Sequence, residues 1–183
     1  LSYLHYDLVN SVIDICRNKL YFKKILKERE MKKLHFKIAI SAPLSVVYDK
    51  MLGLSSKKNY EQWTALFNPT STYEGNWKKG SKILFVGVDA NGEKGGMVSE
   101  IAENKPDEFV SIRHYGLVQG EKEITEGPEV EKWAGGFENY SFEEHDGSTQ
   151  VKVDVDTNED FEDYMNQTFP KALFRLKEIC EQK

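Results

Sequence analysis

Apolar and polar positions follow two different periods along this chain, and the changes of period predict its elements. Residues 34–40 place an apolar side chain at every second position, which is typical of a half-buried strand. Pro43 then suits the first turn of a helix expected over about 43–51. A second short helix is expected over about 55–67, before Asn68-Pro69 ends it.

Five or six antiparallel strands are expected after these helices, because β-prone stretches alternate with turn residues. They cover residues 71–75, 83–88, 96–101, 108–118, 136–144 and 149–156. The intervening stretch 119–136 is rich in Glu and Gly, so we expect a loop there, with a helical turn around 129–133.

The last stretch, residues 158–183, has the period of a long amphipathic helix. Its apolar stripe comprises Phe161, Tyr164, Met165, Phe169, Ala172, Leu173, Leu176, Ile179 and Cys180. Pro170 removes one backbone hydrogen bond inside this helix, so we expect a kink. We therefore expect the first half to stand off a sheet and roof a cavity, and residues 173–180 to pack down tightly.

The order of elements is one strand, two short helices, a run of strands and one long helix. Strands that succeed one another with the helices set apart indicate an α+β fold. The simplest arrangement that buries the last helix is a curved antiparallel sheet wrapped around it. This fold is expected for residues 31–183.

Residues 1–30 differ in composition from residues 31–183 and are expected to form a separate N-terminal extension. Met31 at the head of a clean alternating strand resembles a natural protein start. One hypothesis is that residues 1–30 are translated upstream sequence or a vector-derived extension. The other is a genuine extra helix, since its apolar residues keep a helical spacing, that docks on the domain or mediates dimerisation.

Charge and composition exclude several classes of protein. Residues 31–183 hold nineteen basic and twenty-six acidic side chains, a net charge of −7, which argues against binding of nucleic acid or anionic membranes. No run of eighteen apolar residues predicts a membrane span. Cys16 and Cys180 form no disulfide framework, so we expect a cytoplasmic protein. We expect it to be a monomer or a homodimer.

Alternation within two strands predicts which side chains face inward. Val110, Ile112 and His114 share one face, which would place His114 at a cavity wall, either as a satisfied core histidine or as a ligand contact. On the strand 136–144, we expect Tyr140 to face inward and Glu138 to face outward.

Aromatic side chains are numerous enough either to line a pocket or to fill it. They are Trp63, Phe67, Tyr73, Trp77, Phe85, Trp133, Phe137, Phe161 and Tyr164. Taking alternation and the helix stripe together, the expected ligand-binding residues are Trp63, Phe67, Phe85, His114, Tyr140, Phe142, Phe161, Tyr164 and Met165.

No catalytic residue, metal site or cofactor is expected. The acidic run 154–158 resembles a calcium loop, but its sixth and twelfth positions are Glu159 and Met165, where glycine and glutamate are needed. The pairs Gly95-Gly96 and Gly135-Gly136 match no phosphate-binding fingerprint and are expected in turns or bulges.

Several local motifs succeed one another along residues 31–183. They are Ile40-Ser41-Ala42-Pro43, Val47-Tyr48, Trp63, Gly75-Asn76-Trp77-Lys78-Lys79-Gly80-Ser81, Gly95-Gly96-Met97-Val98, Tyr140-Ser141-Phe142, Thr149-Gln150-Val151, Ala172-Leu173 and Arg175-Leu176-Lys177. In this order they resemble the START-related helix-grip (SRPBCC) superfamily, and within it the branch named for activators of the heat shock protein 90 ATPase.

This resemblance implies the helix-grip fold and a range of functions. The superfamily includes lipid and hormone binders, polyketide cyclases and aromatases. We expect binding of a small hydrophobic or amphipathic ligand between the sheet and the last helix. Two alternatives stay open: a protein-interaction domain without a ligand, similar to a co-chaperone, and a cyclase- or hydrolase-like enzyme that uses His114 or Tyr140.

Overall fold

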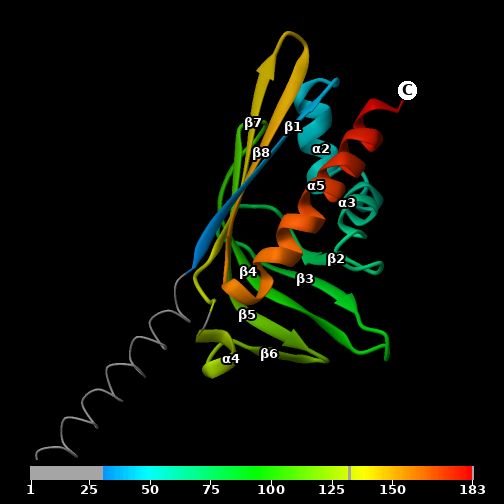
Figure 1. Ribbon diagram of the computed structural model, residues 1–183. Coiled ribbons are helices and arrows are strands. Elements are labelled where there is room, and N and C mark those ends of the chain that lie inside the picture. Colours follow the sequence, from blue (N-terminus) through cyan, green and yellow to red (C-terminus); the bar gives the residue numbers. More distant parts are fainter. Residues whose placement is uncertain (1–30, 132, 183) are drawn as a thin grey trace, which may run out of the picture. The chain divides into compact units, whose positions relative to one another are not determined.

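The computed structural model describes residues 31–131 and 133–182. Both hypotheses for residues 1–30 lie outside these described residues. The described chain has the expected α+β fold, with an antiparallel sheet whose one face is covered by helices (Figure 1).

The described elements keep the expected order. The strands are β1 (Lys32–Ile40), β2 (Thr72–Gly75), β3 (Lys82–Val88), β4 (Lys94–Lys105), β5 (Phe109–Gln119), β6 (Lys122–Ile124), β7 (Phe137–His145) and β8 (Ser148–Thr157). The helices are α2 (Leu44–Leu52), α3 (Lys57–Thr64), α4 (Pro128–Glu131) and α5 (Glu159–Glu181). The strand order is β1-β8-β7-β5-β4-β3-β2, and β6 pairs with β5.

The strand β6 corrects the expected loop over residues 119–136. It consists of Lys122–Ile124 and pairs with residues 117–119 of β5, so seven strands come after the two short helices in the described chain. Three residues are too short to show an alternating pattern, which explains why the sequence did not predict this strand.

The packed part of the core lies between α5 and the first and last strands. Phe36 on β1 stacks on Phe169 of α5, with ring centroids 4.8 Å apart. Leu173 and Leu176, one and two turns further along the helix, are fully buried. The second half of α5 thus packs down as the stripe of apolar residues indicated.

Helix α5 begins with a side-chain cap and continues through its proline. The Asn158 side chain accepts a hydrogen bond of 3.2 Å from the backbone N–H of Phe161. Pro170 lies within the helix on its exposed side. The buried side chains of α5 begin only at Thr168, so the first two turns bury none completely.

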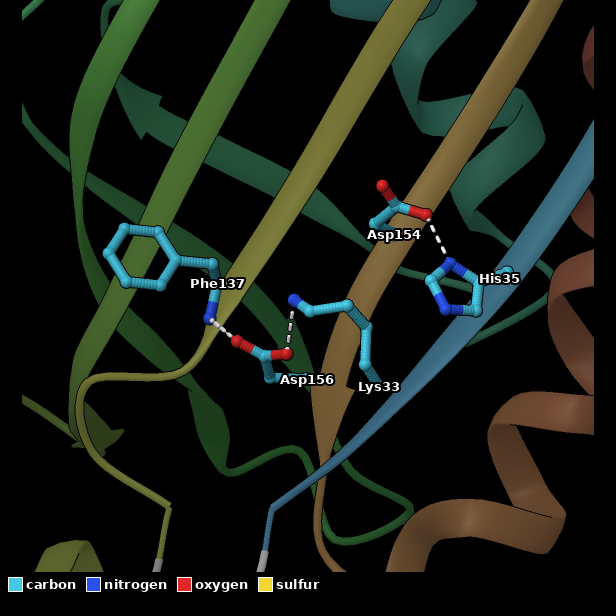
Figure 2. A network of polar contacts seen from close by, with 5 residues as sticks. All are labelled: Lys33, His35, Phe137, Asp154 and Asp156. Carbon is cyan, nitrogen blue, oxygen red and sulfur yellow. Dashed lines mark hydrogen bonds and ion pairs between the residues drawn. The ribbon is translucent and has the colours of Figure 1, made fainter.

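The outer face of the sheet carries a polar network that joins three strands (Figure 2). Asp156 on β8 accepts hydrogen bonds from the Lys33 ammonium of β1 at 2.5 Å and from the backbone N–H of Phe137 at 3.0 Å. His35 and Asp154 pair beside it at 2.6 Å. This network fixes the beginning of β7, the strand that carries Glu138 and Tyr140.

We expected the pair Gly95-Gly96 in a turn or a bulge, but both residues lie inside the strand β4. A Cβ atom on Gly96 would lie 2.0 Å from the Phe85 carbonyl oxygen, so this strand pair requires glycine. The register shifts of β4 occur further along, one of them between Val98 and Ser99. Gly135 does lie in a turn, with a φ of 92°.

Candidate functional site

A cavity of about 490 Å³ lies between the first half of α5, the helix α3 and the sheet. Most of its wall is apolar or aromatic. The lining residues are Tyr60, Trp63, Thr64, Phe67, Asn68, Ser71, Phe85, Val86, Gly87, Gly95, Gly96, Met97, Ile112, His114, Glu138, Tyr140, Phe161, Tyr164, Met165 and Phe169. This volume falls within the range of small-molecule pockets.

Eight of the nine residues expected to bind a ligand lie on this cavity. They are Trp63, Phe67, Phe85, His114, Tyr140, Phe161, Tyr164 and Met165. The ninth, Phe142, does not. It lies in the packed core, where its ring meets that of Tyr48 edge to face at 5.4 Å.

The edge of the cavity is formed by aromatic side chains of α5. Phe161 is 54% exposed and Tyr164 is 43% exposed, although both line the cavity. The Tyr164 hydroxyl donates a hydrogen bond of 2.8 Å to the backbone oxygen of Phe67. This bond links the first half of α5 to the segment after α3.

His114, Glu138 and Tyr140 line the cavity, and with Ser99, which contacts His114, they form a cluster that we call the polar floor. His114 Nδ1 lies 2.8 Å from the hydroxyl oxygen of the fully buried Ser99. His114 Nε2 lies 3.6 Å from one carboxylate oxygen of Glu138. The other carboxylate oxygen accepts a hydrogen bond from the Tyr140 hydroxyl.

The position of Glu138 overturns the expectation that it faces outward. Side chains of a strand alternate between its faces, so Glu138 shares a face with Tyr140 and Phe142. Its charge led us to assign it to solvent, against the alternation. The period of two alone would have placed it in the cavity.

A register shift in the sheet brings Ser99 and His114 together. Val98 pairs with Gly116, whereas Ser99 pairs with His114, so one residue of β5 has no partner here. Nothing in the pattern of either strand indicates this shift, and Ser99 was therefore missed.

Burial and the nearby carboxylate both act on the tyrosines of the site. Desolvation first, and then the charge of Glu138, raise the pKa of the Tyr140 hydroxyl well above its usual range. The same two causes raise the pKa of Tyr60. Both hydroxyls therefore remain protonated at neutral pH.

Several aromatic residues from the sequence pattern lie elsewhere. Tyr73 and Trp77 are buried and pack edge to face on each other and on Tyr60. Trp133 and Phe137 are partly buried but do not line the cavity. Tyr60 and Phe169 also line the cavity, although the sequence did not single them out.

The described residues contain neither a metal-binding group nor a membrane-spanning helix. Within residues 31–131 and 133–182, no three histidine, cysteine or acidic side chains are grouped so as to hold a metal ion. No described helix is both long enough and apolar enough to cross a membrane.

Solved structures with the same fold come from several bacteria. The Aha1 dimer from Colwellia psychrerythraea has 22% identity and a TM-score of 0.57, and the match covers 82% of this chain and 97% of that one. An uncharacterised protein from Rhizobium leguminosarum has 16% identity and a TM-score of 0.58, over 84% and 97% of the two chains.

A protein from Nitrosomonas europaea has 16% identity and a TM-score of 0.61, over 82% of this chain and 94% of its own. No protein-family model matches the sequence, and neither does any curated protein. At these identities the likeness establishes the fold alone: the described chain is a helix-grip domain.

Proposed function

We propose that this protein binds a small hydrophobic or amphipathic molecule in the cavity under the first half of α5. The observation that carries the proposal is a mostly apolar cavity of about 490 Å³ whose wall also holds a few polar side chains, among them His114, Glu138 and Tyr140. An apolar wall with a few convergent polar groups is the usual form of a small-molecule site. The free, buried thiol of Cys180 is compatible with the reducing cytoplasm.

Calorimetric titration with phenylpropanol, a neutral amphipathic probe, tests this proposal. Met165→Trp adds a ring on the cavity side of α5 and should abolish binding by occupying the space. Phe174→Trp is the matched control, since Phe174 is 56% exposed on the same helix and does not line the cavity. Equal binding by both variants, or no binding to the wild-type protein, would refute the cavity as the site.

A second candidate is an enzyme that uses acid–base chemistry. The observation in its favour is the approach of His114 Nε2 to Glu138 at 3.6 Å, beside an apolar binding space. The test is to incubate a bound molecule with the protein and monitor its mass. Conversion by the wild-type protein but not by folded His114→Ala would favour the enzyme.

A third candidate is a protein-interaction domain, for which the resemblance to the activator branch is one support. The other is the exposure of Phe161 and Tyr164 at the edge of the cavity. Under this alternative, small probes would not bind, and Phe161→Ala would weaken capture of a protein partner.

A further inference from the structure

The carboxylate of Glu138 is the group on the polar floor with unused hydrogen-bonding capacity. An ionised carboxylate offers about four acceptor positions. Among the described residues, the Tyr140 hydroxyl is the one hydrogen-bond donor that the Glu138 side chain has. His114 Nε2 lies 3.6 Å away, which is beyond a hydrogen bond.

No lysine or arginine accompanies this carboxylate in the cavity. The described lining residues include no such side chain. Glu143 on the same strand differs in this respect, since it binds the Lys152 ammonium at 2.7 Å on the outer face. The Glu138 side chain is only 18% exposed, so much of its hydration is lost without a permanent counter-charge.

Aromatic rings pack against the two residues that lie next to the carboxylate, Tyr140 and His114. The Trp63 ring lies 6.5 Å from that of Tyr140, and the Phe85 ring lies 6.1 Å from that of His114. Tyr60 is close enough for its hydroxyl to respond to the charge of Glu138. Aromatic faces attract cations, most strongly where water is excluded.

We propose that the cavity selects a protonated amine with an aromatic or aliphatic body. Its ammonium group donates hydrogen bonds to Glu138 and supplies the missing counter-charge, while its apolar body lies against Trp63 and Phe85. This inference rests on the proposed function, because it names the class of ligand for the same cavity.

Calorimetric titration of the full chain with three probes tests the proposal. Phenylpropylamine, phenylpropanol and phenylpropionate share one body and differ in the charge of the head group. We expect the amine to bind at least about tenfold more tightly than the alcohol, since hydrogen bonds to charged groups are the stronger ones. Phenylpropionate should bind more weakly than phenylpropanol, because its negative charge is repelled by that of Glu138.

Two variants assign the preference to its residue. Glu138→Gln should remove most of the advantage that the amine has over the alcohol, because the amide keeps an acceptor for Tyr140 but carries no charge. Glu143→Gln, on the outer face of the same strand, should change none of the three affinities.

The outcomes separate this inference from the proposed function. If the alcohol binds in a way that Met165→Trp abolishes, but the amine binds no more tightly, the cavity stands and the amine proposal is overturned. If none of the probes binds, both proposals are overturned.

Discussion

The two halves of α5 belong to one continuous helix but meet very different surroundings. In the second half, Leu173, Leu176 and Ile179 are at most 4% exposed. In the first half, Phe161 and Tyr164 are 54% and 43% exposed and line a cavity. The same periodic stripe of apolar residues therefore serves packing at one end and an accessible site at the other.

The difference arises from the surfaces that lie opposite each half. The second half packs with β1 and α2 in a core cluster that also contains the apolar side chains of β8, so the space beneath it is filled. The first half faces the polar floor, where the buried groups are hydrogen-bonded and do not fill the space. We infer that stability and ligand binding depend on separate ends of the helix.

The largest expected effect is the loss of packing in the second half. Leu176 is fully buried, so Leu176→Ala should lower the free energy of unfolding by about 2–5 kcal/mol. Urea unfolding monitored by circular dichroism measures this change. A loss below about 1 kcal/mol would mean that this half is not tightly packed.

A smaller loss is expected where strands approach each other beside the cavity. Gly96→Ala places a Cβ atom against the Phe85 carbonyl oxygen, at a φ of 155°. The backbone must shift, so the free energy of unfolding should fall by about 1–3 kcal/mol. Gly92→Ala is the control, because Gly92 also has a positive φ but nothing within 4 Å of an added Cβ. Equal losses in the two variants would exclude the close approach as the cause.

The thiol of Cys180 gives a pH test of the packed half. Burial raises its pKa from 9.0 to about 11, so the folded state holds the proton more tightly than the unfolded state does. The resulting stabilisation is complete below about pH 9 and is lost as the pH rises toward about 11.

Urea unfolding over that pH range measures this effect. The wild-type protein should lose more stability than Cys180→Ala, because the alanine variant lacks the thiol. All other titratable groups are the same in both proteins and cancel in the comparison. Equal losses of stability in the two proteins would show that the pKa of the thiol is not raised in the folded state.

The smallest effect on stability is expected in the first half of the helix. Phe161→Ala removes a side chain that is more than half exposed, so the free energy of unfolding should change by no more than about 0.5 kcal/mol. The affinity for phenylpropanol should nevertheless fall, because the ring lines the cavity. A large loss of stability with unchanged affinity would reverse the roles assigned to the two halves.

Much of the fold can be predicted from local periodicity, and so can the inward faces of His114 and Tyr140, but the contact between Ser99 and His114 cannot. The alternation of β1 and the stripe of α5 predict buried faces because each is one regular element. The pairing of Ser99 with His114 depends on a register shift between two strands, which the sequence of neither strand reveals.

Glu138 and Phe142 lie in positions other than those expected, for different reasons. Glu138 was assigned outward by its charge, although the alternation of β7 places it inward. Phe142 was assigned to the site by its inward face, and it does face inward, but toward the packed end near Tyr48. Alternation predicts which face of the sheet a side chain lies on. It does not predict which half of α5 lies opposite that side chain. The kink expected at Pro170 stays a prediction.

The most direct test of the central claim is native mass spectrometry of gently purified protein, beside its denatured mass. The account predicts an additional mass on the wild-type protein and on Phe174→Trp, lost on denaturation and absent from Met165→Trp. Bare chain masses for the wild-type protein, or an additional mass retained by Met165→Trp, would contradict a ligand held under the first half of α5.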